Sequence, residues 1–123
     1  MGTRRVLVVD DSAIIRTAIA DLIQRSLDDW QVCGEAADGV DAIRKTAELA
    51  PDLALIDLSL PLRNGLEVAK TLHEFHPTLK IVIMSEQDAG MLSHISSEYG
   101  FESLAKSQLF VDLVALLRRL SEA

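Results

Sequence analysis

Short apolar runs alternate with longer amphipathic stretches along this chain, and the alternation limits the folds that it can adopt. The runs Arg4–Val9, Asp52–Asp57 and Leu79–Ser85 are almost continuously apolar, as expected for strands buried on both faces of a parallel sheet. Trp30–Ala37 is half polar, which is typical of a strand near a sheet edge, and Phe101–Ala105 is the weakest run. Together the runs predict five strands.

Between these runs, apolar residues recur with the period of an amphipathic helix. In chain order the five stripes contain Ile14, Ile15, Ala18, Ile19, Leu22 and Ile23; Val40, Ile43 and Ala47; Leu66, Ala69, Leu72 and Phe75; Met91, Leu92 and Ile95; and Phe110, Leu113, Val114, Leu117 and Leu120. Asp38 is a candidate N-cap, and Pro51 and Pro77 end two of the helices. The fourth stretch, from about Asp88 to Tyr99, is only weakly periodic. The repeated strand–helix order predicts an α/β fold, a doubly wound parallel sheet with helices on both faces.

The composition fits one soluble domain. The chain has 123 residues, of which 49% are hydrophobic and 25% charged, so we expect residues 1–123 to form a single domain with its own core. The net charge of −7 argues against nucleic-acid binding by this domain. No stretch is long and apolar enough to span a membrane, and no signal-peptide pattern opens the chain. Cys33 is the one cysteine and suits a reducing compartment, so we expect a cytoplasmic protein.

Polar side chains interrupt the predicted sheet at matching places. Asp10 and Asp11 stand at the carboxyl end of the first strand, Asp57 ends the third, Ser85 ends the fourth and Lys106 follows the fifth. Ligands of open α/β sheets bind at this edge, near the point where strand order reverses. Each residue alone has an ordinary explanation, since such residues cap helices, form turns or lie in solvent. Their joint arrangement favours a ligand site.

The charges of this set point to a metal ion. Two carboxylates about 4 Å apart repel by roughly 4 kcal/mol at an effective dielectric near 20, and one Lys does not balance three of them. A hard divalent cation would, and ligands that are all oxygen suit Mg²⁺. A carboxylate beside Mg²⁺ and Lys is placed to attack phosphorus and form an aspartyl phosphate. Lys106 and the metal would then hold phosphoryl oxygens, and Ser85 could donate a hydrogen bond to one of them.

Four segments together resemble the receiver domain of bacterial two-component response regulators. They are Val8-Val9-Asp10-Asp11-Ser12, Asp57-Leu58-Ser59-Leu60-Pro61-Leu62-Arg63-Asn64-Gly65, Ile83-Met84-Ser85 and Leu104-Ala105-Lys106. The likeness covers the whole chain and implies a flavodoxin-like sheet with five parallel strands in the order 2-1-3-4-5. It also implies a phosphorylatable signalling switch, whose donor is a sensor histidine kinase or a phosphotransfer protein.

The resemblance assigns a role to each residue of the site. Asp57 would be the phosphoacceptor, and the Mg²⁺ ligands would be Asp10, Asp11, Asp57 and the backbone carbonyl of Ser59. Ser85 matches the switch hydroxyl, and Lys106 matches the lysine that contacts the phosphoryl group. Pro61 and Gly65 match the loop after the phosphoacceptor, where Pro fixes φ and Gly permits tight geometry. The chemistry expected is self-phosphorylation and self-dephosphorylation, without enzymatic turnover of other substrates.

The chain departs from the family pattern at several positions. Ser103 stands where the family often has Tyr or Phe, the partner of the switch hydroxyl, although Phe101 lies nearby on the same strand parity. Glu86 replaces the usual small residue after the switch hydroxyl, where its charge could hinder a phosphodonor. We assign Glu86, Gln87 and Ser103 as residues that modulate the site. Ser107 replaces a common Pro and is a candidate cap of the last helix.

These departures keep a second function open. The chain could be a binding module that retains the receiver fold with weak or lost control by phosphorylation. A Mg²⁺-dependent phosphohydrolase is disfavoured because Ser59 stands where a second Asp would be needed, and because the chain has no cap domain. A homodimer is possible through the face formed by the predicted fourth helix (88–99), the fifth strand (101–105) and the fifth helix. We expect no membrane partner.

Overall fold

The computed structural model describes residues 2–62, 64–86, 94–95 and 97–122. The strands are β1 (Arg4–Val9), β2 (Trp30–Ala36), β3 (Leu53–Asp57), β4 (Lys80–Ser85) and β5 (Glu102–Ala105). The helices are α1 (Ala13–Ser26), α2 (Gly39–Leu49), α3 (Gly65–Phe75), α5 (Leu109–Ser121) and the short 3₁₀-helix η1 (Lys106–Gln108). The five predicted strands are thus confirmed, each within one residue of its expected ends at either side.

All neighbouring strands are parallel, and their order in the sheet is β2-β1-β3-β4-β5. The fold class and the strand order expected from the sequence are therefore confirmed. β2 lies at one edge, as its half-polar sequence indicated, and β5 lies at the other. The order reverses between β1 and β3, so the carboxyl ends of these two strands flank the place where open α/β sheets bind ligands.

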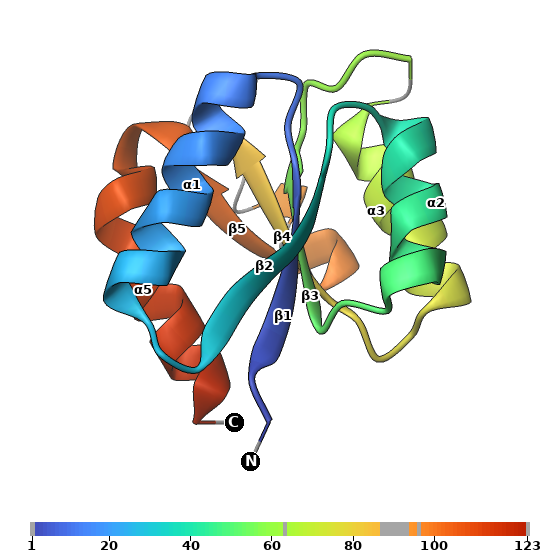
Figure 1. Cartoon of the computed structure of the whole chain (residues 1–123). Coiled ribbons are helices and arrows are strands. Elements are labelled where there is room, and N and C mark those ends of the chain that lie inside the picture. The colour runs from blue at the N-terminus through green and yellow to red at the C-terminus, as the bar shows by residue number, and fades with distance from the viewer. Residues whose placement is uncertain (1, 63, 87–93, 96, 123) are drawn as a thin grey trace.

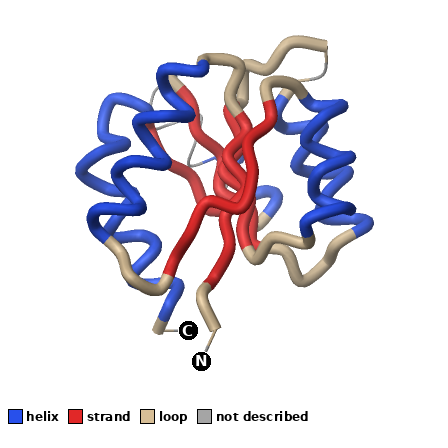
Figure 2. The backbone as a smooth tube through the Cα atoms, in the orientation of Figure 1, coloured by secondary structure: helices blue, strands red, loops and turns tan. Residues whose placement is uncertain are grey.

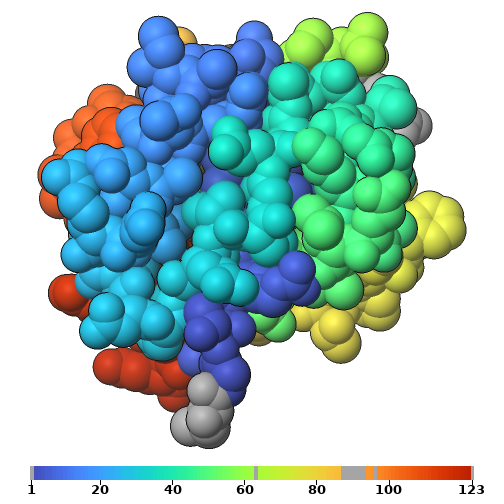
Figure 3. Space-filling model, in the orientation of Figure 1, coloured from blue at the N-terminus to red at the C-terminus, as the bar shows by residue number. Residues whose placement is uncertain are grey.

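Helices cover both faces of the sheet, with α1 and α5 on one face and α2 and α3 on the other (Figures 1 and 2). The alternation of side chains along β1 divides the core between the two faces. Val6 and Val8 pack with α1 and α5, whereas Leu7 and Val9 pack with α2 and α3. In Figure 3 the side chains of α1 and α2 flank the edge strand β2. The central strands are therefore packed on both faces, and this packing positions the polar residues at their carboxyl ends.

Side-chain caps fix the beginnings of the first helices. Ser12, Asp38 and Asn64 each accept a hydrogen bond from the backbone N–H three residues later, which satisfies a donor that the helix leaves unpaired. The predicted cap at Asp38 is thus confirmed. The suggested cap at Ser107 is wrong, because Ser107 lies within η1 and α5 begins after Gln108 without a side-chain cap.

The predicted stripe of α2 is wrong in part. Val40 and Ala47 are exposed, whereas Ala42 and Thr46 are buried. The Thr46 hydroxyl donates to the backbone oxygen of Ala42 at 2.7 Å, and this bond lets a polar residue take a core position. Of the predicted fourth helix, residues 94–95 and 97–99 are helical and the remainder lies outside the described residues. Among the helices described, none combines the length and the apolar character needed to cross a membrane.

Candidate functional site

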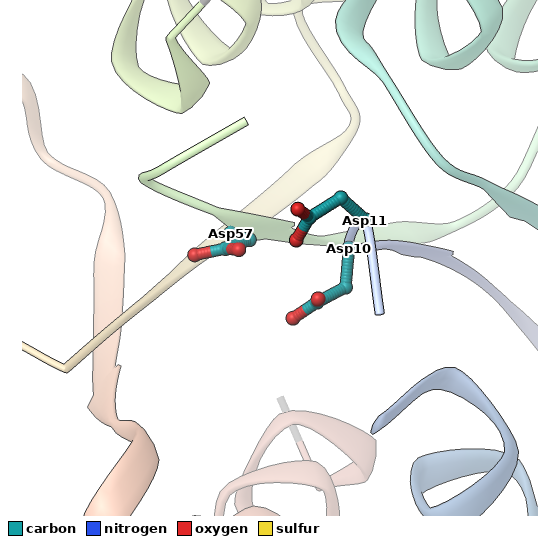
Figure 4. A group of neighbouring side chains, drawn as sticks. All are labelled: Asp10, Asp11 and Asp57. Atoms are coloured by element: carbon teal, nitrogen blue, oxygen red, sulfur yellow. The ribbon is translucent and has the colours of Figure 1, made fainter. Parts of the chain in front are cut away.

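Three aspartates from two separate segments meet at the carboxyl edge of the sheet. Asp10 and Asp11 follow β1, and Asp57 is the last residue of β3. One oxygen atom of each carboxyl group lies within 4.8 Å of the corresponding atoms of the other two. Figure 4 shows the three carboxyl groups gathered in one region. Asp10 and Asp57 are buried and Asp11 is exposed, so the cluster has a buried base and a side open to solvent.

Lys106 bridges the two buried carboxylates. Its Nζ lies 2.7 Å from Oδ2 of Asp10 and 3.2 Å from Oδ2 of Asp57. Lys106 immediately follows β5, and strand β4 lies between β5 and β3 in the sheet. The long lysine side chain therefore reaches past the end of β4 to the two aspartates. The cluster holds three carboxylates and this one ammonium contacts two of them, which leaves an excess of negative charge.

Burial and neighbouring charges shift the pKa values of Asp57 and Lys106. Burial raises the pKa of the Asp57 carboxyl above its ordinary value, although the Ser59 backbone N–H and the Lys106 ammonium act in the opposite direction. Burial also acts to lower the pKa of Lys106, but the carboxylates of Asp10 and Asp57 outweigh it and the net pKa shift is upward. The charged form of Lys106 is therefore favoured, and ionised Asp57 is held at a cost in free energy.

The loop after β3 is fastened closely to Asp57. The backbone N–H of Ser59 donates to Oδ1 of Asp57 at 3.1 Å. The N–H of Leu58 donates to the backbone oxygen of Met84 at 2.8 Å, and the N–H of Gly65 donates to that of Leu58 at 2.8 Å. These bonds leave Oδ2 of Asp57 to face Lys106. The side chain of Asp57 is thus oriented by its own loop as well as by the strand.

The remaining predicted residues that the structure describes lie on β4 or β5 or directly after β4. Ser85, at the end of β4, is buried and pairs in register with Ala105, the residue before Lys106. Glu86 is exposed and lines a surface pocket of about 360 Å³ together with Lys106. Ser103 pairs with Ile83, which places it two residues back along β5 from the Ala105 position. Gln87 lies outside the described residues.

The aromatic ring nearest to Ser103 in the sequence has a structural role. Phe101 is buried in the core on the α2–α3 face, where its ring stacks on Tyr99 at a centroid distance of 6.0 Å. The edge of His73 meets the same ring at 5.7 Å. These contacts account for Phe101 as a packing residue between α3 and the helical residues 97–99.

Arg16 is a residue of the site that sequence reasoning missed. It lies in the second turn of α1 and donates from Nη1 to the backbone oxygen of Asp10 at 2.7 Å. On a helical wheel Arg16 is one more polar residue of an amphipathic helix. The available signal was its position, because long side chains of a helix point toward the N-terminus, and from the second turn Arg16 can reach back to the preceding loop.

The residues present fit a magnesium ion. Mg²⁺ binds oxygen ligands at about 2.1 Å, so two ligands of one ion are at most about 4.2 Å apart. One oxygen of each of the three carboxylates lies within 4.8 Å of the others, so only a small movement is needed to hold the ion together. Asp10 Oδ2 is buried and, its ion pair with Lys106 aside, accepts no hydrogen bond from the described residues. A buried carboxylate oxygen with unused lone pairs is suited to a cation.

Comparison with known proteins agrees with this geometry. The family model for the response regulator receiver domain matches residues 6–118. The chain belongs to the response regulator receiver domain family. Receiver domains are signalling domains of two-component systems that interact with histidine kinases or phosphotransfer proteins. The family also uses Mg²⁺ at an acidic pocket, and the three aspartates of this receiver domain form a cluster that could hold it.

Three of the similar proteins come from Thermotoga maritima. This receiver domain is 37% identical over 82 residues to the chemotaxis protein CheY, with 67% of each chain covered. It is 36% identical over 126 residues to the protein-glutamate methylesterase/protein-glutamine glutaminase, covering 94% of this chain and 36% of the relative. The crystal structure of the response regulator domain of CheB superimposes with a TM-score of 0.82 at 32% identity, covering 98% of this chain and 96% of that one.

The chain spans about a third of the length of the methylesterase relative. The likeness therefore covers the receiver part of that enzyme, and the esterase activity in its name is not carried over to this chain.

Proposed function

We propose that this chain, as one receiver domain over residues 1–123, is a phosphoacceptor switch that takes a phosphoryl group from a histidine kinase or a phosphotransfer protein onto Asp57. The observation that supports this most is the meeting of Asp10, Asp11 and Asp57 in one cluster, with Lys106 in contact with both buried acids. The arrangement gathers negative charge where a cation and a phosphoryl group can compensate for it.

The proposed reaction is a simple displacement at phosphorus. An oxygen of the Asp57 carboxylate forms a bond to phosphorus while the phosphorus–nitrogen bond of the donor phosphohistidine breaks. The electron pair of that bond stays on the imidazole nitrogen, which then takes a proton from solvent. Such a reaction needs positioning and charge neutralisation more than further covalent chemistry.

The other residues of the site would divide this work. Asp10, Asp11, Asp57 and the backbone carbonyl of Ser59 would hold Mg²⁺, which when bound supplies positive charge for the carboxylates and the phosphoryl oxygens. The Lys106 ammonium would contact one phosphoryl oxygen, and the Ser85 hydroxyl would donate a hydrogen bond to another. Because a phosphoryl group contacts these residues better in one conformation, phosphorylation would shift the population toward it.

The change would be passed on through a protein surface. Glu86, Gln87 and Ser103 would modulate the exchange. The assembly that we propose is a homodimer through the face of the predicted fourth helix (88–99), β5 and α5. We propose neither a nucleic-acid nor a membrane partner for this domain, and we expect it to act in the cytoplasm.

Intact mass spectrometry tests the proposal directly. The native chain is incubated with a small phosphodonor such as acetyl phosphate and Mg²⁺, and a single phosphoryl adduct is expected. Asp57→Asn should carry none, whereas Asp52→Asn, which changes an exposed aspartate at the other end of β3, should be labelled like the native chain. An unmodified native chain, or an equal adduct on Asp57→Asn, would contradict the proposal.

One observation favours a second function, a binding module with weak control by phosphorylation. The exposed carboxylate of Glu86 lines the same pocket as Lys106, so an anionic donor would approach it through a negative field. Labelling of Glu86→Ala at an unchanged rate would remove this argument. If the native chain is scarcely labelled and Glu86→Ala is labelled appreciably, the second function is supported.

A further inference from the structure

Arg16 fixes the peptide group between two of the clustered aspartates. The backbone oxygen that accepts its Nη1 hydrogen bond belongs to the peptide that joins Asp10 to Asp11. On the other side of Asp10, the backbone N–H donates to the backbone oxygen of Ala36 in β2 at 3.0 Å. The backbone of Asp10 is therefore held at both of its peptide groups, on one side by an edge strand and on the other by Arg16.

Arg16 is itself held in place. Its Nε donates to Oε1 of Glu35 in β2 at 2.9 Å, and its side chain is only 18% exposed. Lys45 of α2 contacts the backbone oxygen of Glu35 and forms an ion pair of 3.0 Å with Asp41 in the first turn of the same helix. A polar chain of contacts thus runs from α2 across β2 to α1 and ends at Asp10.

The planar guanidinium is suited to this task. It donates in two fixed directions at once, to Glu35 and to the Asp10 carbonyl, which a lysine ammonium on a flexible stem does not reproduce. The carboxylate of Asp10 is oriented separately, since its Oδ1 accepts the backbone N–H of Ser12 at 2.9 Å. Arg16 therefore acts on the main chain of the cluster and leaves the carboxylate oxygens to face Lys106 and a cation.

We propose that Arg16, directed by Glu35, is a positioning residue that holds the Asp10–Asp11 peptide in the geometry that binds Mg²⁺. This inference rests on the proposed function, because it assumes that the three aspartates bind the metal. Residues that orient metal ligands without touching the metal commonly change its affinity by about 10-fold to 100-fold when they are replaced. We expect a loss of about 10-fold here.

The sign of the effect separates positioning from simple electrostatics. Arg16 carries a positive charge close to a cation site, so its charge alone opposes Mg²⁺ binding. If charge were its only influence, Arg16→Met would bind Mg²⁺ more tightly and Arg16→Lys would bind it as the native chain does. If Arg16 positions the peptide, both substitutions weaken binding, because methionine has no donor and a lysine ammonium lacks the fixed geometry in which the guanidinium donates to Glu35 and Asp10 together.

Calorimetric titration of the purified chains with Mg²⁺ tests the proposal without any phosphodonor. The set is the native chain, Arg16→Met, Arg16→Lys and the control Arg25→Met, which removes an equal charge from an exposed ion pair with Asp21 in the last turns of the same helix. Each titration is made well below the unfolding temperature of the variant, where reduced stability does not change the affinity of the folded chain. If Arg16→Met does not fold, Arg16→Lys carries the test.

The expected result is native-like binding by Arg25→Met and dissociation constants about 10-fold higher for both Arg16 variants. Native-like or tighter binding by Arg16→Lys would overturn the positioning role while leaving the proposed function intact. A native chain that binds no Mg²⁺ would instead overturn the metal site of the proposed function. The two failures are therefore distinguishable in one experiment.

Discussion

A Cβ atom on Gly65 would lie 2.0 Å from the backbone oxygen of Asp57, a separation that real Cβ atoms do not reach. It would also lie 2.7 Å from Cα of Leu58. Both neighbours are main-chain atoms of the segment that carries Asp57, so neither can rotate away as a side chain could. Gly65 is thus required for α3 to begin directly against the residue that the proposed function makes the phosphoacceptor.

Gly65→Ala should therefore disturb stability and the site together. Because the added methyl group must push the backbone of Asp57 or the first turn of α3, we expect a loss of about 1–3 kcal/mol in the free energy of unfolding. Phosphorylation by acetyl phosphate should slow as well. Urea unfolding followed by circular dichroism measures the first effect. Gly2→Ala, where no atom lies within 4 Å of the new methyl, is the matched control and should leave both measurements unchanged.

Asp57→Asn should stabilise the chain at neutral pH when divalent cations are absent. The raised pKa of Asp57, caused by burial, means that the ionised carboxylate is less stable in the fold than in the unfolded chain. This penalty is complete above the folded pKa, shrinks as the pH falls through it, and is gone below the unfolded pKa, where the carboxyl group is neutral in both states. The stabilisation by Asn should therefore be largest near pH 7 and should vanish on acidification.

Thermal unfolding of both chains in EDTA across this pH range measures the difference. Asp28→Asn removes one charge from an exposed position just beyond α1 and corrects for the relief of net negative charge. If Asp57→Asn is less stable than the native chain at neutral pH, the ionised Asp57 carboxylate does not destabilise the fold, and the prediction is contradicted.

Lys106→Met should destabilise the chain in EDTA. Removal of the ammonium leaves Asp10 and Asp57 as buried carboxylates without their common counter-charge. Breaking a fully buried ion pair costs about 3–5 kcal/mol, and because Lys106 and the cluster keep some access to solvent we expect about 2 kcal/mol. Urea unfolding at pH 7 gives the value, and Lys80→Met, at the exposed start of β4, is the control.

Addition of Mg²⁺ extends this prediction. If the aspartates bind the metal, saturating Mg²⁺ should recover a large part of the stability that Lys106→Met loses, because the ion replaces the missing positive charge. An equal loss with and without Mg²⁺ would show that the cation does not reach Asp10 and Asp57.

The parts of the fold that were predictable from the sequence are those that a single pattern decides. β1, β3 and β4 are central strands, buried on both faces, and their sequences are almost wholly apolar. The half-polar β2 was expected at an edge for the same reason. The positions of Asp10, Asp57, Ser85 and Lys106 followed because the carboxyl ends of parallel strands share one edge.

Predictions that depended on exact helix faces were less successful. Ile14, Phe75 and Phe110 belong to the expected apolar stripes, yet they are 81%, 71% and 51% exposed. In α5, Leu109 takes the buried place expected of Phe110, and the helix begins directly after the 3₁₀ turn Lys106–Gln108. Such offsets, like the inward reach of Arg16, are decided by tertiary contacts and leave little trace in the local sequence.

Trp30 and Ser121 give a prediction for the opposite end of the sheet. The indole N–H of the buried Trp30, at the start of β2, donates to the Ser121 hydroxyl at 2.6 Å. That hydroxyl in turn donates to the backbone oxygen of Leu117 at 2.9 Å. Ser121→Ala would leave the indole N–H buried without a partner, so we expect a loss of about 1–3 kcal/mol in the free energy of unfolding.

A double-mutant cycle with Trp30→Phe isolates the pair, since the phenyl ring has no N–H to lose and Ser121→Ala should then cost much less. Urea unfolding followed by circular dichroism suits all four chains, and additive losses would mean that the hydrogen bond does not hold the end of α5 to β2.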